Sequence, residues 1–294
     1  MTVISRRAAL GTLAALAAAS VVPAAVRAQD ATPEPVAPPQ TMLPAQPEGQ
    51  AGQTVTINGA DIYYEEYGKA DGPAVLLLHG GLGNGDYFVN QIPALTDAYR
   101  VVVMDSRGHG RSSFDEQPLG YALMAKDVLV LMDHLAIDQA DIVGWSDGGI
   151  IGLEIALTQP ERLNKVVAYG ANYDPTGVRL DIGTDDYFNA YIEAAAADYQ
   201  TISPDPTRWD EFLGNIGNMW ATEPNYTDDQ LRTIQTPFLI LDGVNEEAID
   251  LNQTKLMAEL MPNATLLLMP DTGHFAMFEQ PEEFNRIVLD YLAG

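Results

Sequence analysis

The sequence predicts an α/β domain with a mostly parallel sheet, doubly wound so that helices cover both faces. Three observations support this prediction. Short apolar runs without polar alternation end in glycine-rich turns, which is typical of strands buried on both faces. Segments with apolar residues at helical spacing lie between these runs. The chain has 294 residues, 47% of them hydrophobic, which is enough material for one large core.

Two strand-like segments open the predicted domain. Residues 54–57 and 62–67 flank Asn58-Gly59, a dipeptide that favours a tight hairpin turn. The apolar runs that follow are expected to form the parallel part of the sheet: 75–78, 101–104, 141–143, 166–168, 238–241 and 265–268. Stretches with helical periodicity alternate with these runs: 121–135, 150–157, 254–261 and 281–292.

The alternation stops between residues 172 and 233. This stretch contains no strand-like run, and its helical signals lie at 185–199 and 209–220. A long helical insertion between strands commonly covers an active site. We therefore expect a lid at about 172–233, although ordinary packing explains each of its aromatic residues equally well.

The N-terminal part of the chain is expected to lie outside this domain. Paired arginines precede an alanine-rich apolar run at 8–26, and small residues lie near a cleavage site expected after Ala28. This is the plan of a cleaved secretory signal, and the arginine pair resembles a twin-arginine export signal. We therefore expect residues 1–28 to direct export to the periplasm or beyond. The alternative is an uncleaved membrane anchor, but the run is too weakly apolar to favour it. Residues 29–53 are rich in Pro, Ala, Gln and Glu and are predicted to form a linker before a domain at 54–294.

The composition excludes several classes of protein. The chain carries 41 Asp and Glu against 15 Lys and Arg, a formal net charge of −26. Such a negative surface repels phosphate backbones, so no nucleic acid partner is expected. The absence of cysteine excludes disulfides, thiolate metal sites and a cysteine nucleophile. The oligomeric state is not predicted.

The motif that carries chemistry is Gly-Trp-Ser-Asp-Gly at residues 144–148. It lies between a strand-like run and a helical stretch, which is the context of a nucleophile elbow. An elbow holds its nucleophile in a strained backbone conformation, so the residues two positions before and after must be small. The two glycines of the motif satisfy this requirement around Ser146. If Asp147 were the nucleophile, the bulky Trp145 would stand at one of those positions, so Ser146 is the predicted nucleophile.

A serine hydroxyl needs a base within hydrogen-bond reach. Among the histidines, His274 lies after the last strand-like run, where it can reach a serine at the carboxyl edge of the sheet. His79 stands in a glycine-rich loop and suits a loop-shaping role. His109 lies in an Arg-Gly-His-Gly-Arg loop, and His134 falls late in a helix and is expected at the surface. We predict that His274 is the base.

These motifs together resemble the α/β-hydrolase fold family over roughly residues 54–294. The elbow resembles that of the serine carboxylesterase branch that contains valacyclovir hydrolase. In this family a carboxylate that orients the histidine usually closes a Gly-x-x-Asp turn, which corresponds here to the turn that ends at Glu246. The resemblance therefore implies Glu246 as the acid. The neighbouring Glu247 and Asp242 are alternatives, and Asp174 is a weaker one.

The resemblance and the spacing also suggest how the substrate is held. The backbone N–H groups of Asp147 and, by resemblance, Gly81 are expected to form the oxyanion hole, with Leu82 as an alternative donor. The glycine-rich loop lacks the lysine and the spacing of a phosphate-binding loop. Asp147, Leu82 and Trp145 are predicted to contact substrate. In the valacyclovir-hydrolase-like group an acid at position 147 suits a substrate ammonium group, whereas the alternative is a simple interaction with the helix dipole.

The chain order Ser146, Glu246, His274 is that of α/β hydrolases. We therefore expect an exported serine hydrolase that cleaves small carboxylic esters through an acyl-enzyme, with no cofactor, no metal and a small molecule as its partner. The alternatives are amide, lactone or carbon–carbon hydrolysis, or cofactor-free perhydrolysis, on the same scaffold. A non-catalytic binding protein of this fold is a further alternative, because Glu246 replaces the usual aspartate.

Overall fold

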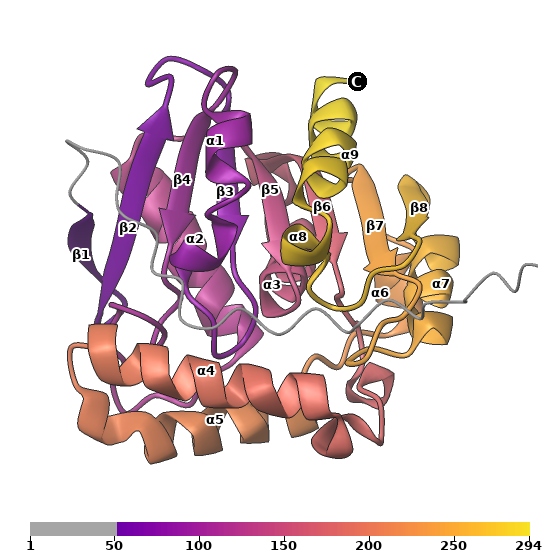
Figure 1. The fold of residues 1–294 in the computed structure, drawn as a ribbon. Coiled ribbons are helices and arrows are strands. Elements are labelled where there is room, and N and C mark those ends of the chain that lie inside the picture. Colours follow the sequence, from indigo (N-terminus) through magenta and orange to yellow (C-terminus); the bar gives the residue numbers. More distant parts are fainter. Residues whose placement is uncertain (1–51) are drawn as a thin grey trace, which may run out of the picture. The chain divides into compact units, whose positions relative to one another are not determined.

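The computed structural model describes residues 52–294, and within them eight strands form a single sheet (Figure 1). The strand order is β1-β2-β4-β3-β5-β6-β7-β8. β2 pairs with β1 and β4 in antiparallel fashion, and every later neighbour is parallel. The strands are β1 (Gln53–Ile57), β2 (Ala60–Gly68), β3 (Ala74–Leu78), β4 (Arg100–Met104), β5 (Ala140–Trp145), β6 (Leu163–Tyr169), β7 (Phe238–Gly243) and β8 (Ala264–Met269). The expected mostly parallel α/β fold is confirmed.

Helices cover both faces of this sheet. Figure 1 shows α2 and α3 on one face and α1 and α9 on the other. The longer of these helices are α2 (Tyr121–His134), α3 (Asp147–Thr158), α7 (Leu251–Leu260) and α9 (Pro281–Ala293), and the short ones are α1 (Ile92–Leu95), α6 (Asp228–Leu231) and α8 (Ala276–Glu279). Short 3-10 helices lie at Gly85–Phe88, Pro160–Arg162, Pro175–Gly177, Ile182–Thr184 and Pro206–Arg208. No helix in the described part of the chain is long and apolar enough to cross a membrane.

The burial of the strands explains their apolar runs, with one exception. Every residue of β3, β5 and β7 is buried, because helices pack on both sides of these strands. β8 has an equally continuous apolar run, yet Leu266 is 38% exposed. β8 is the outermost strand of the sheet, so fewer neighbours cover it. Apolar continuity alone therefore did not distinguish an edge strand from a central one.

Two long helices occupy the segment between β6 and β7. α4 (Asp186–Ile202) begins where the Asp185 side chain accepts the backbone N–H of Phe188, and α5 (Trp209–Thr222) follows after a short turn. In Figure 1 the two helices run side by side across the carboxyl ends of the parallel strands. We call α4 and α5 the lid helices. Their place in the sequence falls within the expected lid segment at 172–233.

The predicted export signal at 1–28 and nearly all of the predicted linker at 29–53 lie outside the described residues. Export, cleavage of the signal and the alternative of a membrane anchor therefore stay predictions. β1 begins at Gln53, close to the expected start of the domain at residue 54.

Candidate active site

Ser146 forms the turn between β5 and α3 by itself. Its backbone has φ 53° and ψ −116°, a strained conformation for a residue with a side chain. The glycines of the motif leave room for this turn. A Cβ at position 144 would lie 2.4 Å from the backbone of Gly148, and one at position 148 would lie 1.9 Å from the carbonyl oxygen of Leu78. The Ser146 residue is only half-buried, so a small molecule can reach its hydroxyl at the carboxyl edge of the sheet.

His274 and Glu246 are brought together from two neighbouring loops. Glu246 follows β7, and His274 lies between β8 and α8. The imidazole Nδ1 is 2.8 Å from Oε1 and 3.0 Å from Oε2 of Glu246, and both side chains are buried. Oε1 also accepts the backbone N–H groups of Ala248 and Ile249, at 2.7 and 2.9 Å. Glu246 is therefore the acid of its turn whose carboxylate contacts the imidazole.

The neighbouring acids hold the main chain of this region instead. Glu247 accepts the backbone N–H of His274 at 2.8 Å, and Glu279 accepts that of Gly273 at 2.7 Å. Asp242 accepts the N–H of its own neighbour, Gly243, at 2.9 Å. Asp174, the weakest alternative, caps the 3-10 helix Pro175–Gly177. No group of three or more His, Asp or Glu side chains in residues 52–294 is arranged to hold a metal ion.

Burial and hydrogen bonds set the proton positions of the pair. Burial lowers the pKa of His274, and the surrounding carboxylates oppose that shift. Burial raises the pKa of Glu246, while its hydrogen bonds from Asp242, Ile249 and Ala248 oppose the rise. A neutral imidazole with its proton on Nδ1, facing Glu246, leaves Nε2 free to accept a proton.

The glycine-rich loop after β3 is held by His79. The Nδ1 of His79 lies 2.8 Å from the Gly80 carbonyl oxygen, and its Nε2 accepts the Ser106 backbone N–H at 2.9 Å. Burial lowers the pKa of His79 to about 4, so the ring is neutral and Nδ1 is the donor. The same carbonyl accepts the N–H of Gly83 at 3.0 Å. Two donors thus fix the peptide between Gly80 and Gly81, and with it the direction of the Gly81 N–H.

The next peptide of this loop is tied to a lid helix. The hydroxyl of Tyr191, in α4, donates to the Gly81 carbonyl at 2.7 Å, which orients the peptide whose N–H belongs to Leu82. Leu82 has φ 67°, in the left-handed region that side chains rarely adopt, and its side chain is buried. Both candidate oxyanion donors, Gly81 and Leu82, therefore have fixed N–H directions.

Asp147 is buried between α2, α3 and the lid. Its carboxylate accepts the Tyr121 hydroxyl at 2.9 Å and the Trp220 indole N–H at 3.0 and 3.2 Å. Burial raises its pKa to about 6, although both hydrogen bonds oppose the shift. A Cβ on Gly81 would lie 2.4 Å from the Trp220 ring and 2.5 Å from the Asp147 carboxylate. The lid residue Trp220 therefore lies against both Asp147 and Gly81 of the predicted oxyanion hole.

Trp145 packs against the loop that carries His274. Its indole N–H donates to the His274 carbonyl at 2.9 Å, and its ring stacks on Tyr87 with centroids 5.6 Å apart. The side chain is buried, and its contacts support the loop between β8 and α8 that carries His274. We call this loop the histidine loop. Its surroundings give no support to the predicted contact with substrate.

Comparisons with known proteins agree with this geometry. A model of the alpha/beta hydrolase fold matches residues 73–198. RutD of Caulobacter sp. strain K31, described in its name as a carbamate hydrolase, is 31% identical over 82% of this chain and 98% of its own length. The chain belongs to the α/β-hydrolase family. The family resemblance expected from the sequence is confirmed, and the chain is a hydrolase of the α/β fold.

Other proteins similar to this α/β hydrolase are named for different activities. The mouse serine hydrolase BPHL is 28% identical over 84% of this chain and 90% of its own. A solved structure described as Est816, an N-acyl homoserine lactone degrading enzyme, superposes with a TM-score of 0.69 at 26% identity, over 81% of this chain and all of its own.

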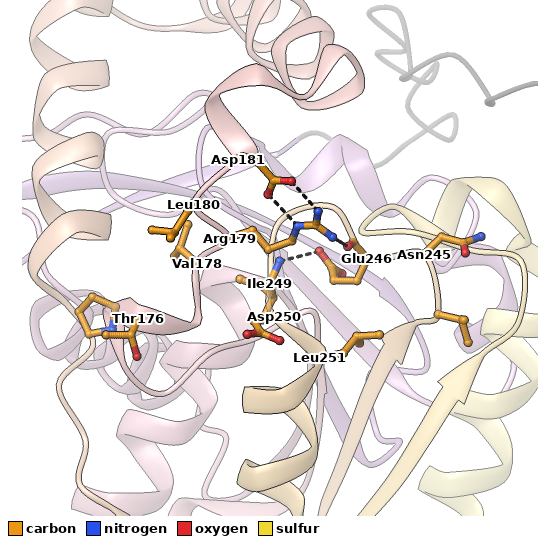
Figure 2. A pocket seen from close by; sticks show the side chains of 12 residues that line it. Thr176, Val178, Arg179, Leu180, Asp181, Asn245, Glu246, Ile249, Asp250 and Leu251 are labelled. Carbon is orange, nitrogen blue, oxygen red and sulfur yellow. Dashed lines mark hydrogen bonds and ion pairs between the residues drawn. The ribbon is translucent and has the colours of Figure 1, made fainter.

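A cavity of about 960 Å³ lies beside Glu246 (Figure 2). Glu246 and Arg179 line it, but Ser146 and His274 do not. The Arg179 guanidinium pairs with Asp181 at 2.8 Å and donates to the Glu246 carbonyl at 3.0 Å. Arg179 thus fixes the main chain at Glu246. Its side chain contacts Asp181 and the Glu246 carbonyl.

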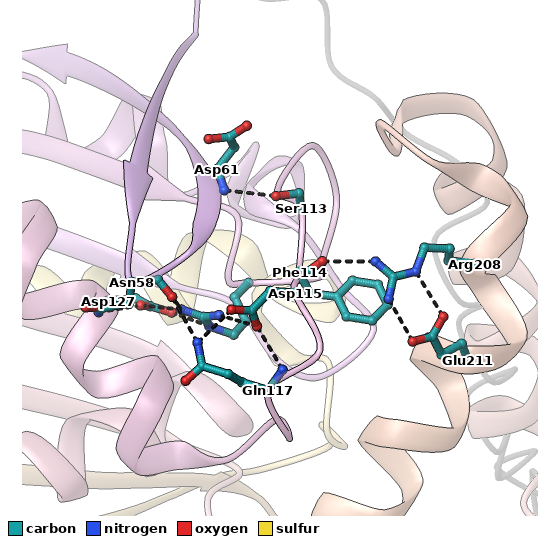
Figure 3. A network of polar contacts seen from close by, with 10 residues as sticks. Asn58, Asp61, Ser113, Phe114, Asp115, Gln117, Asp127, Arg208 and Glu211 are labelled. Carbon is teal, nitrogen blue, oxygen red and sulfur yellow. Dashed lines mark hydrogen bonds and ion pairs between the residues drawn. The ribbon is translucent and has the colours of Figure 1, made fainter.

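The Arg-Gly-His-Gly-Arg motif also has a structural role. The buried guanidinium of Arg107 binds Asp127 through two hydrogen bonds of 2.7 and 2.8 Å. Figure 3 shows Asp127 and Asn58 side by side in this network. On the lid side of the same view, Arg208 donates to the Phe114 carbonyl at 2.9 Å and lies 3.7 Å from the Phe114 ring centroid. Arg107 therefore fastens α2 to the opening hairpin, and Phe114, a few residues further along the same loop, contacts the lid.

Several residues of the site were not identified from the sequence. Tyr121 and Trp220 hold the Asp147 carboxylate, and Tyr191 holds the oxyanion loop. Nothing in the sequence links Tyr121 or Trp220 to Asp147. These contacts join residues that are far apart in the chain, so no local spacing signals them.

Proposed function

We propose that this hydrolase is a serine esterase that cleaves small carboxylic esters through an acyl-enzyme on Ser146. The observation that carries the proposal is the buried contact of 2.8 Å between His274 Nδ1 and Glu246, on the edge of the sheet where the strained Ser146 elbow lies. A base oriented by a carboxylate beside an activated hydroxyl is the machinery of acyl transfer.

In the proposed reaction the Ser146 hydroxyl attacks the carbonyl carbon while His274 Nε2 takes its proton. Glu246 holds the Nδ1 proton and stabilises the imidazolium that forms. The backbone N–H groups of Asp147 and Gly81, or Leu82 in place of Gly81, donate to the oxyanion. His274 then protonates the leaving alcohol, and water hydrolyses the acyl-enzyme by the same route.

Carbamate hydrolysis is the second candidate, because RutD, the relative named for it, is 31% identical over most of this chain. A carbamate also presents a carbonyl to the nucleophile, so the same residues would act on it. The lactone activity in the name of Est816 concerns a cyclic ester and is compatible with the main proposal.

A panel of p-nitrophenyl esters of graded acyl length tests the proposal. We expect turnover with the highest kcat/KM for the shortest acyl chains, because Trp220 lies close over Gly81 and Asp147 and leaves little room beside the oxyanion loop. An aryl carbamate and an acyl homoserine lactone serve as comparison substrates. Turnover of the carbamate without any ester would overturn the esterase proposal, and no turnover at all would favour a binding protein.

We also propose that Asp147 attracts a substrate ammonium group. The carboxylate is buried, and both of its hydrogen-bond donors are neutral. We expect an aminoacyl ester to be hydrolysed about tenfold or more faster than its deaminated analogue near pH 7, because a hydrogen bond to a charged group contributes more than a neutral one. The preference should weaken below the Asp147 pKa of about 6 and above about pH 8, where the substrate ammonium loses its proton. In Asp147→Asn the aminoacyl ester and its deaminated analogue should be hydrolysed at similar rates.

The matched control for this preference is Tyr121→Phe. It removes a donor from Asp147 and keeps the charge, so the preference for the aminoacyl ester should persist. If Asp147→Asn leaves the ratio unchanged, the carboxylate serves only as an acceptor for Tyr121 and Trp220.

A further inference from the structure

We propose that Asp242 is a positioning residue that donates a hydrogen bond to Glu246 and so holds the carboxylate that orients His274. The inference deepens the proposed function and rests on Glu246 as the acid of the reaction. It adds a second carboxyl group behind the first, at the end of β7.

Asp242 and Glu246 form a buried pair of carboxyl groups. Both residues are at most 2% exposed, and a hydrogen bond between their side chains raises the pKa of Asp242 and opposes the rise in the pKa of Glu246. A carboxylate can only accept hydrogen bonds, so two ionised carboxylates cannot bond to one another. One member of the pair must therefore carry a proton.

The other partners of the pair place this proton on Asp242. Glu246 accepts two backbone N–H groups and faces the imidazole Nδ1, and all three contacts favour its ionised form. Asp242 accepts one backbone N–H, from Gly243, and its second oxygen is 2.7 Å from the hydroxyl of Thr254. Burial and the neighbouring charge of Glu246 raise the pKa of Asp242 well above its ordinary value, in agreement with this assignment.

The surrounding charges also disfavour ionisation of Asp242 and Glu246 at the same time. The titratable and charged groups that act on the pair come from β6, the loop after β7, the loop that carries His274 and the segment before α4: Tyr169, Glu247, His274 and Arg179. Two further carboxylates, Asp147 and Glu279, act on His274. Arg179 is the one permanent cation among these groups, and its guanidinium is paired with Asp181. Acids predominate, so the site does not compensate a second buried charge on Asp242.

The donated hydrogen bond has two consequences for the reaction. It completes the set of four partners around the Glu246 carboxylate, which fixes the direction of the lone pair that faces His274. It also makes Glu246 less basic, so the carboxylate stabilises the imidazolium less strongly. His274 therefore stays an unprotonated base down to a lower pH than it would beside an isolated carboxylate.

The pH dependence of kcat/KM for p-nitrophenyl acetate tests this role in Asp242→Asn and Asp242→Ala. Alanine removes the donor, and we expect kcat/KM to fall roughly ten- to a hundredfold. The acid limb, which is the fall of kcat/KM at low pH, should move to higher pH by about one unit. The asparagine amide can still donate to Glu246 and accept from Gly243. It should recover most of the lost activity and leave the acid limb in place.

Glu247→Gln is the matched control, because it removes a nearby carboxylate that bonds only to the main chain of His274 among its described contacts. Loss of its negative charge should move the acid limb to lower pH. If Asp242→Asn shifts the limb in that same direction, Asp242 is ionised in the native protein and the inference is wrong. Equal losses in both Asp242 variants without any shift would show a purely structural role. If the alanine variant does not fold, the direction of the shift in Asp242→Asn still decides.

Failure of this inference is distinguishable from failure of the proposed function. If the unmodified protein turns over the esters and the acid limb of its pH profile lies at the same pH in Asp242→Ala, only the role of Asp242 is overturned. An unmodified protein that neither hydrolyses the esters nor reacts with a fluorophosphonate overturns the serine mechanism and the role of Asp242 with it.

Discussion

Ser146→Ala is expected to lower kcat for ester hydrolysis by roughly 10⁴-fold or more, because it removes the atom that attacks the carbonyl carbon. KM should change little, since the remaining pocket still binds the ester. Steady-state kinetics on the best p-nitrophenyl ester measure both quantities. The fold should persist, because alanine occupies the φ 53° position at a cost similar to that of serine.

Ser146→Gly is the matched control for this prediction. Glycine also lacks the hydroxyl, so it should be equally inactive, but it adopts a positive φ without strain. We expect its melting temperature to equal or exceed that of Ser146→Ala. An alanine variant that keeps more than about one hundredth of the native kcat would show that another group attacks the ester, since loss of a nucleophile costs far more than that.

Glu246→Gln should lower kcat by roughly 10³- to 10⁴-fold, through the wrong tautomer of His274. The N–H groups of Ala248 and Ile249 require an acceptor, so the amide oxygen turns toward them. The amide NH₂ then takes the place of Oε2, 3.0 Å from Nδ1, where it repels the Nδ1 proton and donates to Nδ1 once that proton is lost. The tautomer with its proton on Nε2 is thereby favoured, and in that form Nε2 cannot take the proton of Ser146.

Glu247→Gln separates this effect from a general loss of negative charge. An amide oxygen can still accept the backbone N–H of His274, so the expected loss of kcat is less than about tenfold. Glu246→Asp keeps the charge with a side chain one methylene shorter and should fall between the two. A loss in Glu247→Gln equal to that in Glu246→Gln would contradict the assignment of Glu246.

The parts of this protein that the sequence predicts best are those encoded locally. The elbow at Ser146 needs only a strand, a helix and two glycines close to the serine, all within a few residues. The central strands carry uninterrupted apolar runs because both of their faces are covered. The lid helices begin and end within a few residues of their predicted bounds, because their apolar spacing is regular.

The site details that depend on side-chain direction could not be predicted in the same way. Asp242, Glu246 and Glu247 lie within one turn, and only its three-dimensional path decides which carboxylate meets His274. The partners of Asp147 come from α2 and α5, and the acceptor for the Trp145 indole N–H is the distant His274 carbonyl. Such contacts are set by packing between distant segments, for which one sequence holds no spacing rule.

Identification of the residue that a fluorophosphonate modifies tests the central claim most directly. The native protein is incubated with the probe, digested and mapped by mass spectrometry. The serine mechanism predicts one adduct per chain, on the peptide that contains Ser146, and no adduct in Ser146→Ala. An adduct on another residue, or an unmodified native protein, would contradict it.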